Sequence, residues 1–163
     1  MALLEGSCHC GAVHFMVKSH TPQPYTRCYC TICRKTAGGG GYAVNIMAET
    51  KSFVVEGMEH VTVYQASTDG EGGAVSSHNW RHFCKRCGSQ LWIWSARWPD
   101  NVYPFASAID SDLPPPAEHT HIMLDFKADW VDLPEDSAAD RRFPRFPDET
   151  IAEWHRKRGL WED

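Results

Sequence analysis

The sequence lacks the features that mark membrane, nucleic-acid-binding and secreted proteins. No apolar run approaches the roughly 20 residues that a membrane-spanning helix needs. Basic residues are not in excess, because 16 lysines and arginines against 21 acidic residues give a net charge of −5. This balance argues against a nucleic-acid partner. The opening Met-Ala-Leu-Leu-Glu-Gly turns polar too soon for a signal peptide. We therefore expect a cytoplasmic protein with no membrane or nucleic-acid partner.

Length and composition are those of one globular unit. A chain of 163 residues can bury about two thirds of its unfolded surface in one domain. Its 42% hydrophobic and 23% charged residues are ordinary for a soluble fold. With no internal repeat in view, we predict a single domain over residues 1–163.

Cysteine is present only in groups. Three motifs hold all seven cysteines: Cys8-His-Cys10, Cys28-Tyr-Cys-Thr-Ile-Cys33 and Cys84-Lys-Arg-Cys87. A structural zinc site has four protein ligands, whereas a catalytic site typically has three and an open position. Seven cysteines divide naturally as four plus three. We expect a closed site from Cys8, Cys10, Cys84 and Cys87, and an open site from Cys28, Cys30 and Cys33.

Three other interpretations of the cysteines are weaker. Disulfides need an oxidising compartment and would leave one of seven thiols unpaired. An iron–sulfur cluster also uses thiolates, but the run at 28–33 lacks the usual ferredoxin spacings. Unliganded buried cysteines would not cluster in this way.

Three ordered motifs resemble one known family. They are Gly6–Phe15, Cys28–Lys35 and Arg81–Ser89, with weaker matches at Ala108–Asp110 and His119–Ile122. Over about residues 3–133 the sequence resembles the glutathione-dependent formaldehyde-activating enzymes, a family that also includes centromere protein V.

The resemblance implies a fold, two metals and a reaction. The fold is all-β and mainly antiparallel, with coiled sheets around a rubredoxin-like zinc centre (a β-tent). Two zinc ions per chain are implied: a structural one on Cys8, Cys10, Cys84 and Cys87, and one tied to activity on Cys28, Cys30 and Cys33. The implied partners are a thiol such as glutathione and an aldehyde such as formaldehyde. The implied activity is that of a carbon–sulfur lyase, which forms S-hydroxymethylglutathione or runs the reverse step.

The pattern of β-forming residues predicts many short strands and one helix. We expect strands over residues 12–18, 25–27, 42–47, 52–56, 61–64, 77–83, 90–94, 102–109 and 121–124, with a polar loop at 68–73 and irregular surface at 129–142. Residues 134–163 form an extension beyond the family match, with a helix near 148–158. Asp148 is its expected cap and Gly159 its stop, and Ile151 and Trp154 face inward. This helix packs on the domain or on a second subunit, so a homo-oligomer is possible.

Candidate substrate contacts follow the three-cysteine run. Arg34 and Lys35 offer cations for the carboxylates of glutathione, and Gly38 and Gly39 offer backbone amides. Arg97 and Trp98 are further candidates for the pocket. The alternatives are solubilising surface charge, a flexible connector and ordinary packing.

Several histidines are weaker candidates. His9 and His82 flank cysteines of the closed site and are candidates for hydrogen bonds to it. His78 is a candidate fourth metal ligand or proton carrier, and the pair His119 and His121 is a candidate for metal binding. Two other functions also stay open, a thiol-binding module without catalysis and a structural partner-binding protein.

Overall fold

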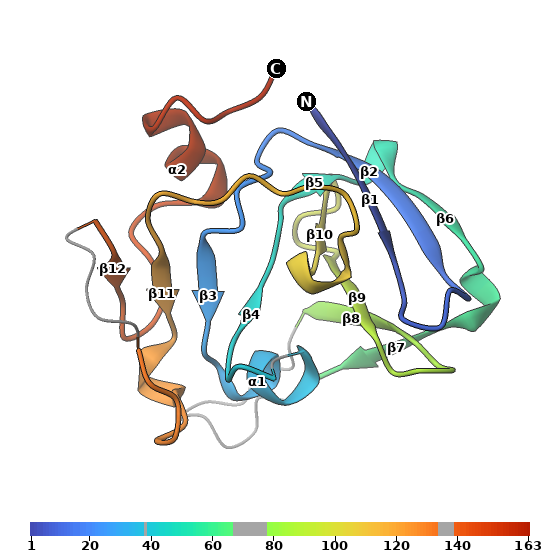
Figure 1. Ribbon diagram of the computed structural model, residues 1–163, viewed down its shortest axis with the longest axis horizontal. Coiled ribbons are helices and arrows are strands. Elements are labelled where there is room, and N and C mark those ends of the chain that lie inside the picture. The colour runs from blue at the N-terminus through green and yellow to red at the C-terminus, as the bar shows by residue number, and fades with distance from the viewer. Residues whose placement is uncertain (38, 67–77, 134–138) are drawn as a thin grey trace.

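The structure is a computed structural model that describes residues 1–37, 39–66, 78–133 and 139–163. Its described residues form three sheets with two short helices (Figure 1). Most strand pairs are antiparallel, and in the described part of the chain the exceptions are the parallel pairs of β11 with β3 and β12. The all-β, mainly antiparallel prediction is confirmed.

The first sheet has the order β1-β2-β6 and leads into the first cysteine pair. It consists of β1 (Ala2–Ser7), β2 (His14–Ser19) and β6 (Val54–Glu56). In β2 the buried Phe15 and Val17 alternate with exposed neighbours, as a half-buried strand requires. Strand β1 was not predicted, because its residues lack β-branched side chains. It forms through a full antiparallel register with β2.

The second sheet has the order β5-β10-β9-β8-β7. Its strands are β5 (Ala48–Glu49), β10 (Asn101–Pro104), β9 (Gln90–Ser95), β8 (Asn79–Cys84) and β7 (Val61–Gln65). Consecutive residues Leu91, Trp92 and Ile93 are all buried, so β9 is covered on both faces, as predicted. The predicted strand 102–109 is wrong in length. It ends at Pro104. After one more hydrogen bond, from the Phe105 N–H to the Leu91 carbonyl, a 3-10 turn, η3 (Ala106–Ala108), follows.

The third sheet has the order β12-β11-β3-β4 and carries the three-cysteine run. Its strands are β12 (Arg141–Arg142), β11 (Thr120–Ile122), β3 (Thr26–Cys28) and β4 (Ala43–Val44). The predicted strand 42–47 is wrong as one element. Strand β4 ends at Val44, and beyond it Asn45 and Met47 form only isolated bridges, to Phe105 and Thr21. The expectation of irregular structure at 129–142 missed β12, and the predicted loop at 68–73 lies outside the described residues.

A short helix that was not predicted, α1 (Thr31–Ala37), begins directly after Cys30. The Arg34 N–H donates to the Cys30 carbonyl at 2.9 Å, and the Thr36 hydroxyl donates to the Ile32 carbonyl at 2.7 Å. The three-cysteine run is therefore helical from Thr31 onward. The helix holds Cys33 in a buried position.

The C-terminal helix α2 (Ile151–Lys157) confirms the helix near 148–158 and corrects its cap. Thr150 caps the helix in a capping box with Glu153, while Asp148 binds Arg141 instead. Gly159 follows with a φ of +67°. Neither helix of the described chain has the length or apolar content needed to cross a bilayer.

Candidate functional site

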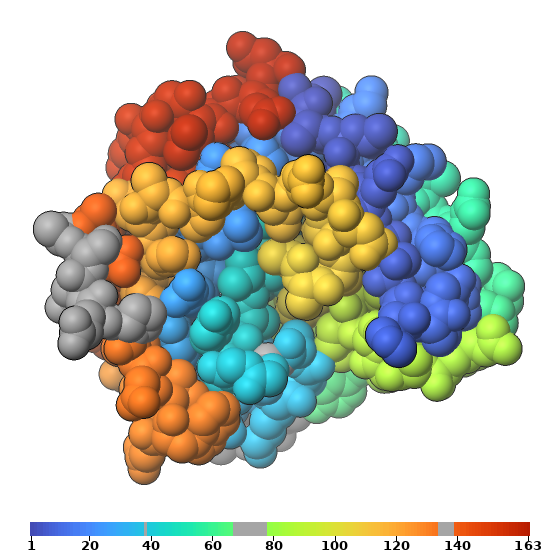
Figure 2. Space-filling model, in the orientation of Figure 1, coloured from blue at the N-terminus to red at the C-terminus, as the bar shows by residue number. Residues whose placement is uncertain are grey.

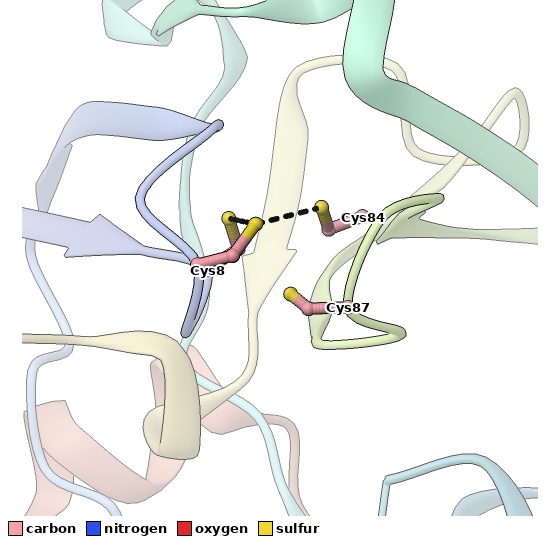
Figure 3. Close-up of side chains that lie close together, drawn as sticks. Cys8, Cys84 and Cys87 are labelled. Atoms are coloured by element: carbon pink, nitrogen blue, oxygen red, sulfur yellow. Dashed lines mark hydrogen bonds between the residues drawn. The ribbon is translucent and has the colours of Figure 1, made fainter.

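Two turns bring four cysteines together. Cys8 and Cys10 stand between β1 and β2, and Cys84 and Cys87 stand at the end of β8 and in the turn after it. Figure 3 shows Cys8 facing Cys84 and Cys87 across a small gap. The four sulfur atoms all lie within 4.8 Å of one another, as the grouping predicted from sequence requires.

The spacing of these sulfurs fits a tetrahedral metal. The Sγ atoms of Cys8 and Cys10 are 3.6 Å apart, and those of Cys10 and Cys84 are 3.8 Å apart. Zn–S bonds of about 2.3 Å give a tetrahedron with edges of about 3.8 Å. The Val13 N–H also donates to the Cys8 sulfur at 3.3 Å. Hydrogen bonds from Ser89 lower the pKa of the Cys87 thiol to about 5, so this sulfur readily becomes a thiolate.

Cys28, Cys30 and Cys33 form a second sulfur group, also within 4.8 Å of one another. Cys28 ends β3, Cys30 precedes α1, and Cys33 lies on α1. The Cys33 N–H donates to the Cys30 sulfur at 3.3 Å. Hydrogen bonds from the thiols of Cys28 and Cys33 lower the pKa of Cys30, while the bond to Cys30 raises the pKa of Cys28. The pKa of Cys33 is raised as well, so without a cation the group favours a single thiolate, on Cys30.

A buried arginine, which sequence reasoning did not single out, lies against this second group. Arg81 on β8 is only 3% exposed, and its Nη2 is 3.7 Å from the Cys33 sulfur. Cys30 and Cys33 pack in a cluster of apolar side chains that includes Ile93 and Phe105. In the sequence, the one feature that could have drawn attention to Arg81 is its position as the first residue of the Arg81–Ser89 motif.

A buried polar chain lies beside the second group. Tyr29, between Cys28 and Cys30, is 1% exposed, and its hydroxyl lies 2.8 Å from Nδ1 of the fully buried His121. The backbone N–H of His119 donates to the Asp140 carboxylate at 2.7 Å. Burial, followed by nearby Arg27, lowers the pKa of His121, so this histidine stays neutral. Neither His119 nor His121 belongs to a metal-ligating group of the described residues, so the structure does not support them as metal ligands.

A polar cleft of about 840 Å³ runs beside α1. Arg34, Lys35 and Gly39, which are predicted substrate contacts, line it, and Ser7 and Asp110 line it as well. On the face shown in Figure 2, the light-blue α1 segment and the yellow segment near residue 107 flank this region. A Cβ atom built on Gly39 meets nothing within 4 Å, so its backbone is openly accessible. Gly38 lies outside the described residues.

The remaining candidates fall into three places. His9 lines the cleft, and its backbone N–H donates to the Ser89 hydroxyl at 3.1 Å. His82 instead stacks on Trp92, with ring centroids 5.1 Å apart, and borders a separate apolar pocket of about 320 Å³. The other three candidates are exposed and do not line the cleft: His78, Arg97 and Trp98. The three sulfurs of the second group do not line the cleft, which borders the same helix.

Known proteins resemble this chain in sequence and in fold. Residues 3–123 match the family model for the glutathione-dependent formaldehyde-activating enzyme. A Halomonas elongata protein named "Putative glutathione-dependent formaldehyde-activating enzyme" is 58% identical over 160 residues, which cover 98% of this chain and 99% of that protein. The crystal structure of a Rhodobacter sphaeroides protein matches with a TM-score of 0.52 and 26% identity, over 68% of this chain and 91% of the other. The chain therefore belongs to the glutathione-dependent formaldehyde-activating enzyme family.

Proposed function

We propose that the protein is a zinc enzyme that joins a thiol such as glutathione to formaldehyde, or cleaves the adduct as a carbon–sulfur lyase. The observation that carries this proposal is the second sulfur group. It gathers three cysteines with no fourth protein ligand among the described residues, and its Cys33 lies on α1, the helix that also carries the two cations of the polar cleft. Three ligands and a free position are typical of a catalytic zinc site.

The donor sets of both groups suit zinc. Four thiols at tetrahedral spacing fit a structural site on Cys8, Cys10, Cys84 and Cys87, and three fit an open site on Cys28, Cys30 and Cys33. A zinc ion on the open site would supply a position that favours a substrate thiol in its thiolate form. We thus propose two zinc ions per chain, in the reducing cytoplasm where unpaired thiols persist.

The residues of the cleft suit the charges of glutathione. Arg34 and Lys35 would bind its carboxylates, and the open backbone at Gly39 would offer an N–H group. Asp110 on the lining would suit its ammonium group. These contacts would hold the thiol near the second group while its sulfur attacks the carbonyl carbon. The S–C bond forms, the C=O π bond breaks, and the thiol proton ends on the oxygen.

The test is an exchange assay with ¹³C-formaldehyde and glutathione, followed by NMR. Zinc-loaded protein should speed exchange between free aldehyde and adduct above the rate without protein. Cys30→Ser should remove this effect, and Arg34→Ala with Lys35→Ala should raise KM more than it lowers kcat. Glutathione binding with no change in exchange would instead indicate a thiol-binding module, and no binding of any thiol would indicate a structural protein.

A further inference from the structure

Arg81 lies on the face of β8 that points toward the second sulfur group. In the sheet it pairs with Tyr64 on β7 and Ile93 on β9, and Ile93 packs with Cys30 and Cys33. Alternate residues of a strand face opposite sides of a sheet. Cys84, three residues later on the same strand, therefore faces the other side and belongs to the first group. Strand β8 thus contributes to the surroundings of both groups.

The charge of Arg81 has no carboxylate partner among the described residues. Its guanidinium is permanently protonated and carries five N–H donors. Nη2 lies 3.7 Å from the Cys33 sulfur, and Nε and Nη1 are buried with no hydrogen-bond partner in the described structure. A buried charge without compensation costs several kcal/mol. Among the residues that the structure describes, the adjacent sulfurs are the group that can supply the compensating negative charge.

The charges balance when a divalent metal is bound. Three thiolates and one divalent cation sum to −1, and Arg81 brings the total to zero. A substrate thiolate in the open position then makes the total −1, whereas without Arg81 it would be −2. Because the site is buried, this difference of one unit of charge acts in a medium of low dielectric, and salt screens it only weakly.

We propose that Arg81 is the built-in counter-charge of the three-cysteine metal site, and that it allows an anionic thiolate to occupy the open position. Arg81 is a positioning residue, because it contacts a metal ligand rather than the substrate. This inference rests on the proposed function, in which the second group holds a metal.

The test compares the wild type with three variants. Arg81→Met removes the charge and keeps an apolar side chain of similar reach, and Arg81→Lys keeps the charge without the planar fork. Arg156→Met is the control, because it removes one positive charge from an exposed position on α2, where Arg156 stacks on Trp161. Each protein is titrated with Co²⁺, whose visible spectrum reports thiolate coordination, and then with 2-mercaptoethanol as a simple thiol. A chelator competition at low and high salt gives the affinity of each metal.

For Arg81→Met we expect the first metal to bind as in the wild type and the second at least tenfold more weakly at both salt concentrations. The spectral response to 2-mercaptoethanol should weaken by a similar factor or disappear. Arg81→Lys should be intermediate, and Arg156→Met should match the wild type.

Two results would overturn the inference, and they are distinguishable. A wild type that binds only one metal contradicts the proposed function and the inference together. A wild type with two metals, beside an Arg81→Met protein with unchanged second-metal and thiol affinities, contradicts the inference alone. If Arg81→Met fails to fold, Arg81→Lys decides the question. A loss of second-metal and thiol affinity of less than tenfold in Arg81→Lys would support the role of the charge, and a loss of tenfold or more would refute it.

Discussion

Replacing Trp154 with alanine should detach the C-terminal helix from the body of the protein. The helix has seven residues, which is too short to be stable alone in water. Trp154 is 1% exposed and stacks on Tyr25 with ring centroids 3.7 Å apart. The Arg158 guanidinium carbon lies 4.4 Å from the centroid of the same indole ring. Trp154 therefore supplies a large part of the packing that holds α2 on the protein, together with the buried His155.

The expected loss of folding free energy follows from the burial of the Trp154 side chain. Removing a buried tryptophan side chain costs about 3–5 kcal/mol, of which about 1 kcal/mol belongs to aromatic stacking. The indole N–H also donates to Glu118 at 3.0 Å, but Arg158 still binds that carboxylate. The substitution thus leaves no buried acid without a partner, and lost packing accounts for the whole effect. Trp154→Ala should lower the free energy of unfolding by roughly 3–5 kcal/mol.

Losing the Trp154 side chain should weaken metal binding by the second sulfur group more than by the first. Tyr25 directly precedes β3, which ends at Cys28, whereas the first group lies on turns of the other sheets. Urea unfolding by circular dichroism gives the stability, and Co²⁺ titration gives the occupancy of each group. Trp98→Ala is the matched control, since Trp98 is 52% exposed, and it should change stability by less than about 0.5 kcal/mol. A Trp154→Ala protein within about 1 kcal/mol of the wild type would refute the packing argument.

Three further predictions concern the first sulfur group, the turn at Gly41 and the pH dependence of stability. Cys84→Ser should abolish cooperative unfolding in circular dichroism, since structural zinc contributes about 10–16 kcal/mol and net stability is about 5–15 kcal/mol; a normal melt would refute a metal role. Gly41→Ala should cost at least about 1–2 kcal/mol in urea unfolding. The reason is that φ is +87° and the new Cβ would lie 2.2 Å from the Val131 side chain, so unchanged stability would contradict the close packing of this turn. Burial lowers the pKa of His155, so its folded form stays neutral while the unfolded form takes up a proton. Stability should then fall as pH drops below about 6.5, and His155→Gln should reduce that fall in melting temperature; equal slopes would argue against it.

The sequence alone was enough to group the cysteines and place the family. Thiols are rare and chemically distinctive, so seven of them in three short motifs predict their own grouping, and the structure brings the same sets together. The all-β class and the C-terminal helix also followed from local patterns, because alternation and capping signals act over a few residues. Even so, the cap is Thr150 rather than Asp148, since Arg141 binds Asp148.

What only the tertiary structure decided depends on contacts between distant segments. The segment from residue 42 to 49 divides between two sheets, because its pairing partners lie on β3 and β10, and local propensity does not encode partners. Helix α1 forms where Cys30 and Cys33 turn the chain, and the pattern of apolar residues gave no sign of it. In the sequence, only its place at the start of the Arg81–Ser89 motif distinguishes Arg81 from a surface cation. Its importance arises from burial against Cys33, 48 residues earlier, because a charge matters in proportion to the water that the fold removes from around it.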